Sequence, residues 1–254
     1  MIQSAPAENS PLISIVTITY NAARELPATV ESVLAQDFRD FEHIVVDGAS
    51  SDETLAVARR NPDARIVSER DRGLYDAMNK GLRLARGKYV LFLNAGDAFH
   101  SSDTLSRYAS YGRRGYDIIF GDTVIVDADR RIKGPRHLSA PQQLTFESFS
   151  HGMLICHQAF MVRREIAPEY DLAYRFSADY DWTVRCIKAA DPRRCVNIAA
   201  VAIDYLSDGL TDKNHRASLR ERFDVMACHY GRAKAIWRHL GFIPRAIARK
   251  LRRR

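Results

Sequence analysis

Carboxylate and amide side chains follow three short apolar segments within the first hundred residues. The segments end in Asn21, Asp47 and Asp97. Short β-branched runs of this kind are typical of buried parallel strands, whose carboxyl ends form the edge where open α/β sheets bind ligands. Acidic groups gathered at such an edge favour a divalent cation bound together with a phosphate-bearing ligand.

Strands and helices that alternate along the first half of the chain must position these groups. Strand patterns occur at residues 13–19, 43–46, 65–68 and 89–93, and apolar residues at helical spacing occur at 25–36, 53–60 and 73–86. The alternation predicts βαβ units with right-handed, parallel connections. We therefore expect the three polar ends to meet at the carboxyl edge of one parallel sheet.

The second half of the chain has a different pattern. Strands are expected at residues 117–127, with an interruption at Gly121, and at 153–156, 159–162 and 196–205, with a helix at 178–190. Hairpin-like and helical units alternate here, which indicates antiparallel strands added to a parallel core. The whole predicts an α/β fold with a mixed, mainly parallel central sheet.

Composition bounds the organisation of the chain. Its 254 residues are 46% hydrophobic and 27% charged, enough for one substantial core. The net charge is +7, but residues 232–254 hold nine Lys and Arg and no acid, so the remaining 231 residues carry −2. We expect a flexible lead over residues 1–11, a core domain over 12–212 and a basic helical tail over 213–254.

The sequence has no feature that predicts export or membrane insertion. The first residues lack a basic and then apolar leader, and no apolar run approaches the roughly 18 residues that span a bilayer. The four cysteines form no CxxC pair, which fits neither a zinc site nor a dense disulfide framework. We therefore expect a cytoplasmic protein.

Two polar turns can bind a ligand, although each also has a structural interpretation. The turn at residues 47–52 (DGASSD) can hold a nucleobase or ribose through Asp47 and Ser50, or Asp47 can simply cap the turn. The turn at residues 94–97 (NAGD) can receive a cation and a diphosphate, or it can be an Asx turn after a buried strand. Neither GxGxxG after the first strand nor GxxxxGK[ST] occurs, which argues against dinucleotide-binding and P-loop proteins.

Taken together, the motifs resemble those of family-2 glycosyltransferases of the GT-A fold. The segments SIVTITYN, VVDGASSD, SERDRGLYDAMNKGLRLARGKYVLFLNAGD and SADYDWTVR follow in that family's order between residue 13 and about residue 210. The resemblance implies a Rossmann-like three-layer sandwich as the catalytic domain. It also implies an inverting transfer of a single sugar from a nucleoside-diphosphate sugar, for which we expect a UDP-sugar.

The resemblance assigns residues to the donor. Ten positions match those that hold the nucleotide or its diphosphate: Thr19, Tyr20, Asn21, Asp47, Ser50, Asp71, Asn79, Asn94, Ala95 and Gly96. Asn94 and Gly96 stand where the family's DxD motif has its two acids, so Asp97 is the one carboxylate left. We expect Asp97 to bind Mg²⁺ or Mn²⁺.

The helix that starts near residue 178 carries the expected catalytic base. Asp179 matches the family's base, whereas Asp181, two residues further on, faces roughly the opposite way. The resemblance places Asp181, His157 and Gln158 on the acceptor side. Outside the family context, both acids are explained equally by the preference of a helix start for negative charge.

The basic tail predicts a membrane contact. Residues 236, 240, 243, 247 and 251 form one apolar stripe with Trp237 and Phe242 beside it, and arginines cover the rest; Pro244 is expected to divide the helix. This pattern suits an anionic membrane surface, and a helix packed on the domain fits nearly as well. No nucleic acid is expected as a partner, because aromatic and basic residues interleave poorly for base stacking.

We therefore expect a peripheral enzyme on the inner face of the cell membrane. Its acceptor would be a hydroxyl of a lipid-linked glycan in cell-surface polysaccharide assembly, such as an O-antigen or exopolysaccharide. The competing class is a non-catalytic module that binds nucleotide or membrane and uses the tail for attachment.

Overall fold

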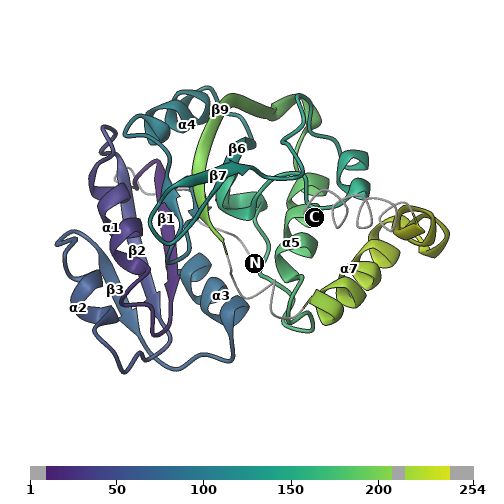
Figure 1. The fold of residues 1–254 in the computed structure, drawn as a ribbon. Helices are drawn as coiled ribbons and strands as arrows, with labels where there is room; N and C mark the ends of the chain where they lie inside the picture. Colours follow the sequence, from purple (N-terminus) through teal and green to yellow (C-terminus); the bar gives the residue numbers. More distant parts are fainter. Residues whose placement is uncertain (1–9, 208–214, 241–254) are drawn as a thin grey trace.

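One mixed sheet with helices packed against it forms the body of the protein (Figure 1). The computed structural model describes residues 10–207 and 215–240. Within them, the nine-stranded sheet has the order β3-β2-β1-β4-β8-β6-β9-β5, with β7 paired to β6. The expected α/β class with a mixed sheet is confirmed.

The amino-terminal half is parallel, as the alternation of strands and helices predicts. Its elements are β1 (Ile13–Thr19), α1 (Leu26–Leu34), β2 (Phe41–Asp47), α2 (Thr54–Ala58), β3 (Arg65–Ser68), α3 (Leu74–Leu84) and β4 (Tyr89–Phe92). β1 pairs in parallel with β2 and β4, and β2 pairs in parallel with β3. All three connections therefore deliver their strand ends to the same edge.

Successive residues of β2 show how the layers form. Val45 packs with α1 and α2, whereas Ile44 and Val46 belong to the core cluster that contains the apolar side of α3. Adjacent strand residues point to opposite faces, so α1 and α2 cover one face and α3 covers the other. Gly81 permits this close packing, because a Cβ there would lie 2.3 Å from Val16 Cγ1.

The carboxyl-terminal half adds antiparallel strands. Its elements are β5 (Ala98–Phe99), α4 (Thr104–Arg113), β6 (Ile118–Val126), β7 (Ile132–Pro135), η2 (His157–Ala159), β8 (Phe160–Arg163), α5 (Ala178–Ala189), β9 (Cys195–Leu206) and α7 (His215–Tyr230). β8 runs antiparallel to β4 and to β6, and β6 is parallel to β9. β6 therefore runs in the direction of β4 and extends past the carboxyl edge of the parallel strands.

The expected strand at residues 153–156 is wrong. These residues form a buried connection that leads into the 3₁₀ turn η2, with Met153, Ile155 and Cys156 in the core. A short apolar run is compatible with either state, and periodicity alone does not distinguish them. The strand expected from residue 159 begins one residue later, at Phe160.

Helix α7 lies beside α5 (Figure 1). α7 is followed by a second helical segment at residues 232–240, whose Ala235 is buried. Most of the expected lead at 1–11, the boundary at 212 and the expected break at Pro244 lie outside the described residues. Among the residues that are described, no helix is both long and apolar enough to cross a membrane.

Candidate active site

The ends of β1 and β2 are fastened together by hydrogen bonds. The Gly48 amide donates to the Thr19 carbonyl at 3.0 Å, the Asn21 amide to Ser50 Oγ at 2.8 Å, and the Ser51 amide to Asn21 Oδ1 at 2.9 Å. Asn21 adopts a left-handed backbone with φ 46°, a conformation that Asn tolerates better than most residues. The two turns form a single rigid rim.

Asp47 lies beneath this rim and shapes it. Its buried carboxylate accepts hydrogen bonds from the Ser50 amide at 3.0 Å, from Ser68 Oγ at 2.6 Å and from Ser50 Oγ. These contacts match the structural interpretation in which Asp47 caps the turn at residues 47–52. Asp47 therefore orders the turn from within, while Ser50 extends the network to the amide of Asn21.

Gly48 lies in close contact with the side chains of Tyr20 and Asp71 at the rim. A Cβ on Gly48 would lie 2.7 Å from Asp71 Oδ2 and 3.2 Å from the Tyr20 ring. Asp71 Oδ1 accepts the Gly73 amide at 2.9 Å, and the Tyr20 side chain is 64% exposed. An exposed ring beside a fixed carboxylate can stack on a planar group and accept its hydrogen bonds.

Asn79 serves the loop before α5. Its amide donates to the Tyr170 carbonyl at 3.0 Å and its Oδ1 accepts the Tyr170 amide at 2.7 Å, and the side chain is buried. Both ends of the amide are thus occupied by one backbone segment. Asn79, expected at the nucleotide, contacts that loop instead.

The turn after β4 contains unpaired polar atoms. The Ala95 amide donates to the Ile18 carbonyl at 3.2 Å, and the Gly96 amide, at φ +98°, donates to Thr29 Oγ1 at 2.9 Å. Asn94 Oδ1 and Thr19 Oγ1 are buried and have no hydrogen-bond partner within the described residues. Buried polar atoms are usually satisfied, so these two mark a place that a polar ligand would complete.

Asp97 points inward from the same turn. Its side chain is 5% exposed, and Oδ1 accepts the Leu206 amide at 2.9 Å. Burial raises the pKa of Asp97 to about 7, against the lowering effects of the Leu206 amide, Arg130 and a hydrogen bond from Gln158. Near neutral pH part of this group is therefore protonated.

The 94–97 turn offers few protein ligands to a divalent cation. The described residues contain no group of three His, Cys, Asp or Glu that could hold one. Asp97 supplies a carboxylate and Asn94 Oδ1 supplies a spare oxygen, but Mg²⁺ and Mn²⁺ prefer about six ligands. The turn fits a cation only if a bound diphosphate supplies oxygens as well.

Asp179 lies in the first turn of α5, close to α3. Its Oδ1 accepts the Tyr75 hydroxyl at 3.2 Å and the Tyr180 amide at 2.9 Å, while its Oδ2 has no hydrogen bond to any described residue. Tyr75 follows Asp71 by four residues, so one short loop joins the rim to this carboxylate. The Tyr75–Asp179 pair thus places a half-buried carboxylate beside the rim with one oxygen available.

His157 and Gln158 lie between the two carboxylates. Burial lowers the pKa of His157 to about 4, partly opposed by the nearby Asp179 charge, so the imidazole is neutral at pH 7. Its Nε2 lies 2.6 Å from the Tyr170 hydroxyl, and its buried Nδ1 has no partner in the described part of the chain. Gln158 bonds to Asp97.

Tyr205 of β9 supports the same convergence. Its pKa is raised by burial first, and then by the charges of both Asp97 and Asp179. The 94–97 turn, the His157–Gln158 pair and the start of α5 therefore surround one site at the carboxyl edge of the sheet.

Comparison with known proteins assigns this arrangement to a family. Residues 14–171 match the sequence model described as "Glycosyl transferase family 2", which is more than half of the chain. The chain belongs to glycosyl transferase family 2. The expected family is thus confirmed.

Two relatives of this family 2 glycosyltransferase are named as biosynthesis glycosyltransferases. A PGL/p-HBAD biosynthesis glycosyltransferase of Mycobacterium bovis is 39% identical over 188 residues, 70% of each chain. TuaG of Bacillus subtilis, named a putative teichuronic acid biosynthesis glycosyltransferase, is 24% identical over 257 residues, 95% of this chain and 98% of TuaG.

Solved structures share the GT-A architecture. Staphylococcus aureus TarS 1-349 in complex with UDP-GlcNAc superposes with a TM-score of 0.72 at 18% identity, covering 91% of this chain and 73% of that one. Glucosyl-3-phosphoglycerate synthase of Mycobacterium tuberculosis, in complex with Mn²⁺ and UDP, gives 0.63 at 16% identity, covering 87% and 80%. At these identities the likeness shows the fold alone.

Asp181 faces away from Asp179, as the helical spacing predicts. Its buried carboxylate lies 2.7 Å from Arg185 Nε and 2.7 Å from His229 Nε2, which comes from α7. Both oxygens are engaged within the protein. The residue expected on the acceptor side therefore joins α5 to α7.

Arg130 is a site residue that the sequence reasoning missed. It lies in the turn between β6 and β7, where Nη1 donates to the Gly96 carbonyl at 2.7 Å and Nη2 lies 3.8 Å from the Asp204 carboxylate. This contact places a fixed positive charge at the 94–97 turn. Arg130 lies 34 residues from Gly96 along the chain, so no local sequence pattern indicates this contact.

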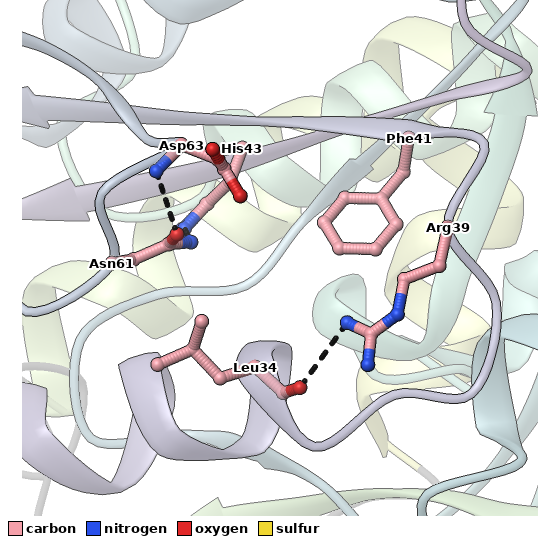
Figure 2. A pocket seen from close by; sticks show the side chains of 6 residues that line it. All are labelled: Leu34, Arg39, Phe41, His43, Asn61 and Asp63. Atoms are coloured by element: carbon pink, nitrogen blue, oxygen red, sulfur yellow. Dashed lines mark hydrogen bonds between the residues drawn. The ribbon is translucent and has the colours of Figure 1, made fainter.

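A pocket lies in another part of the fold. Figure 2 shows a pocket of about 300 Å³ lined by Leu34, Arg39, Phe41, His43, Asn61 and Asp63. Phe41 begins β2, so this pocket lies near the amino ends of the strands rather than the carboxyl edge. His43 is engaged with Thr17 and Asn61, and burial lowers its pKa to about 4.

Proposed function

We propose that this family 2 glycosyltransferase transfers one sugar, with inversion, from a UDP-sugar to a hydroxyl of a lipid-linked glycan in cell-surface polysaccharide assembly. The observation that carries the proposal is the position of Asp179, held by Tyr75 beside the rim and the 94–97 turn, where Thr19 Oγ1 and Asn94 Oδ1 are buried and unpaired within the described residues. We assign the catalytic domain to residues 12–212 and the tail to 213–254.

The donor nucleotide is assigned to the rim. The exposed Tyr20 ring and the Asp71 carboxylate near it suit a base or ribose, and Thr19 Oγ1 and Asn94 Oδ1 are available to the donor's polar groups. The TarS complex with UDP-GlcNAc and the synthase complex with UDP, both of the same fold, support a uridine nucleotide.

Asp179 is assigned as the general base. Its free oxygen would accept the proton of the acceptor hydroxyl while that oxygen bonds to the anomeric carbon and the bond to the diphosphate breaks on the opposite face. A positioned base contributes about 10²–10⁴-fold to such a reaction. Tyr75 fixes the orientation of the carboxylate through its hydrogen bond to the other oxygen.

A Mg²⁺ or Mn²⁺ ion is assigned to the 94–97 turn together with the donor diphosphate. Bound there, it would offset the negative charge that grows on the leaving group. Asp97 and Asn94 Oδ1 are its protein ligands, and Arg130 contributes positive charge next to Gly96. The synthase complex that contains both Mn²⁺ and UDP supports the use of a divalent cation with the donor.

The tail is assigned to the inner membrane surface. On residues 232–240, Trp237 is 74% exposed, and Ile236 and Leu240 are exposed beside it. Lys234 and Arg238 pair with Glu147, so one side of this helix packs on the domain and leaves the apolar side outward. Residues 241–254, with most of the predicted stripe, lie outside the described residues.

One experiment tests the proposal as a whole. The full chain is incubated with UDP-, GDP- and dTDP-sugars, Mn²⁺ and lipid-linked glycan acceptors, and release of nucleoside diphosphate is measured. We expect release with a UDP-sugar that depends on the acceptor. Tight nucleotide binding without release for any donor and acceptor would contradict it and favour a binding module.

Membrane attachment is tested separately with vesicles of neutral or anionic lipid. We expect sedimentation of the full chain with anionic vesicles only, and weaker sedimentation of Trp237→Ser. Leu172→Ser, which changes an exposed apolar residue far along the chain, is the matched control. Equal binding by all three chains would contradict the assignment of the tail.

A further inference from the structure

The segment that delivers Asp179 depends on α7 for its hydrogen bonds. Glu221 accepts three backbone amides with its carboxylate: Arg175 at 3.0 Å, Phe176 at 2.7 Å and Ser177 at 3.0 Å. Ser177 is the residue directly before α5, and residues 167–176 contain neither helix nor strand. A carboxylate from another helix therefore satisfies amides that no sheet or helix of their own segment satisfies.

Two further contacts hold α5 on either side of Asp179. Ser177 Oγ donates to the Ser218 carbonyl at 3.2 Å, and His229 Nε2 lies 2.7 Å from Asp181 Oδ1. Residues 177 and 181 thus both contact α7, one before and one after residue 179. The Asp179 carboxylate itself contacts Tyr75 and faces the site.

A general base must be positioned precisely, so the contacts that hold α5 against α7, here called the clamp, bear on catalysis. A displacement of about 1 Å in a reacting group can reduce a rate by roughly 100-fold. The irregular segment before α5 determines how the first turn of α5 is oriented. Three hydrogen bonds from this segment to the Glu221 carboxylate fix the position of the segment. Within the described residues, the amides at 175–177 make no other hydrogen bond.

We propose that Glu221 is a positioning residue for the catalytic base, with the Asp181–His229 contact as a second clamp. α7 then belongs to the catalytic machinery although it lies beyond the segment that matches the family. This inference rests on the proposed role of Asp179. It adds that the carboxyl-terminal helix sets the geometry in which Asp179 works.

A double-mutant cycle tests the inference in the full-length chain. Glu221→Gln keeps the size of the side chain but leaves one acceptor oxygen and puts an NH₂ group against a backbone amide. We expect kcat to fall by about 10- to 100-fold with an unchanged Kd for UDP. In an Asp179→Asn background the same substitution should cause no further loss, because residues that act through one another are not additive.

Asp224→Asn is the matched control, since it removes one negative charge from an exposed position on the same helix. Hydrogen exchange of amides 175–177 should accelerate in Glu221→Gln and not in Asp224→Asn. His229→Leu, which breaks the second clamp, provides an independent variant if Glu221→Gln fails to fold, and we expect a smaller fall in kcat with the same non-additivity.

The outcomes separate the two proposals. A normal kcat in both Glu221→Gln and His229→Leu, or an equal fall with and without Asp179, would overturn the role of Glu221. A normal kcat in Asp179→Asn would instead overturn the proposed base and leave the exchange data to report only a structural contact.

Discussion

The donor rim and the catalytic side of this glycosyltransferase are built in opposite ways. At the rim, Asn21, Asp47, Ser50 and Ser68 bond to one another across adjacent strand ends. On the catalytic side, Asp179 meets Tyr75 from 104 residues away, and Asp97 meets Leu206 from 109 residues away. One region is assembled from neighbouring turns and the other from distant elements.

The two regions also differ in how well their polar groups are satisfied. Asp47 is surrounded by donors, so the rim is rigid before a ligand arrives. Burial instead raises the pKa of Asp97 to about 7 and lowers that of His157 to about 4, and His157 Nδ1 has no partner in the described residues. Perturbed groups of this kind concentrate at functional sites. The contrast supports the proposal that the rim binds the donor and that the other side carries the reaction.

The largest expected effect separates chemistry from binding. Asp179→Asn should lower kcat by about 10²–10⁴-fold, because the amide cannot accept the acceptor proton. The Kd for UDP should stay within about twofold, since the rim is untouched. Steady-state kinetics and titration calorimetry measure the two quantities, and a comparable loss in both would remove the distinction between the regions.

The pH dependence of stability probes burial rather than chemistry. His43 has a folded pKa of about 4 against an ordinary value near 6.5, so the unfolded chain binds more protons as the pH falls. The stability it contributes is complete above pH 6.5 and is lost toward pH 4, by about 3 kcal/mol in total.

This prediction is checked by urea unfolding at pH 7 and pH 4.5. Wild type should lose more free energy of unfolding between the two than His43→Gln does, because the variant has no imidazole to protonate. His100→Gln, at an exposed position, is the control. Identical losses of unfolding free energy in wild type and His43→Gln would show that burial of His43 does not cause the pH dependence of stability.

A substitution at the rim should have the opposite signature to that at Asp179. Asp71→Asn removes a charged acceptor beside Gly48, and we expect the Kd for UDP to rise by about 3- to 10-fold, the equivalent of one hydrogen bond. The kcat at saturating donor should change little. Asp63→Asn, in the pocket of Figure 2, is the control and should alter neither quantity.

The smallest expected effect concerns the cation. Mn²⁺ alone should leave the midpoint temperature of thermal unfolding unchanged, because the described residues offer no cluster of three metal ligands. Mn²⁺ with UDP should raise the midpoint above that with UDP alone, as linked binding requires. A clear shift with Mn²⁺ alone would reveal a protein site that forms without the diphosphate.

The parallel half was predictable from sequence because its signals are local. The strands over 13–19 and 65–68 have the bounds expected, and the helices differ by one residue at the start and two at the end. Period-2 and period-3.6 patterns are properties of short windows. The strand expected at 153–156 failed because buried apolar residues also occur in connections.

The site residues divide along the same line. The rim's Asn21 and Ser50 meet because strand ends of a parallel sheet lie at one edge, whereas their contact with the nucleotide stays a prediction. The neighbours of Asp97, Asn79 and Asp181 could not be foreseen, since Leu206, Tyr170 and His229 lie 109, 91 and 48 residues away. Arg130 was missed for the same reason.

The amino-acid sequence by itself determined the family, the parallel order of the first strands and the loss of two acids from the family's DxD motif. Only the tertiary structure decided that Asp97 turns inward, that Tyr75 contacts Asp179 and that Glu221 of α7 holds the segment before α5. Spacing along the chain specifies which face of a strand or helix a residue occupies. Which distant group it meets depends on how those faces pack.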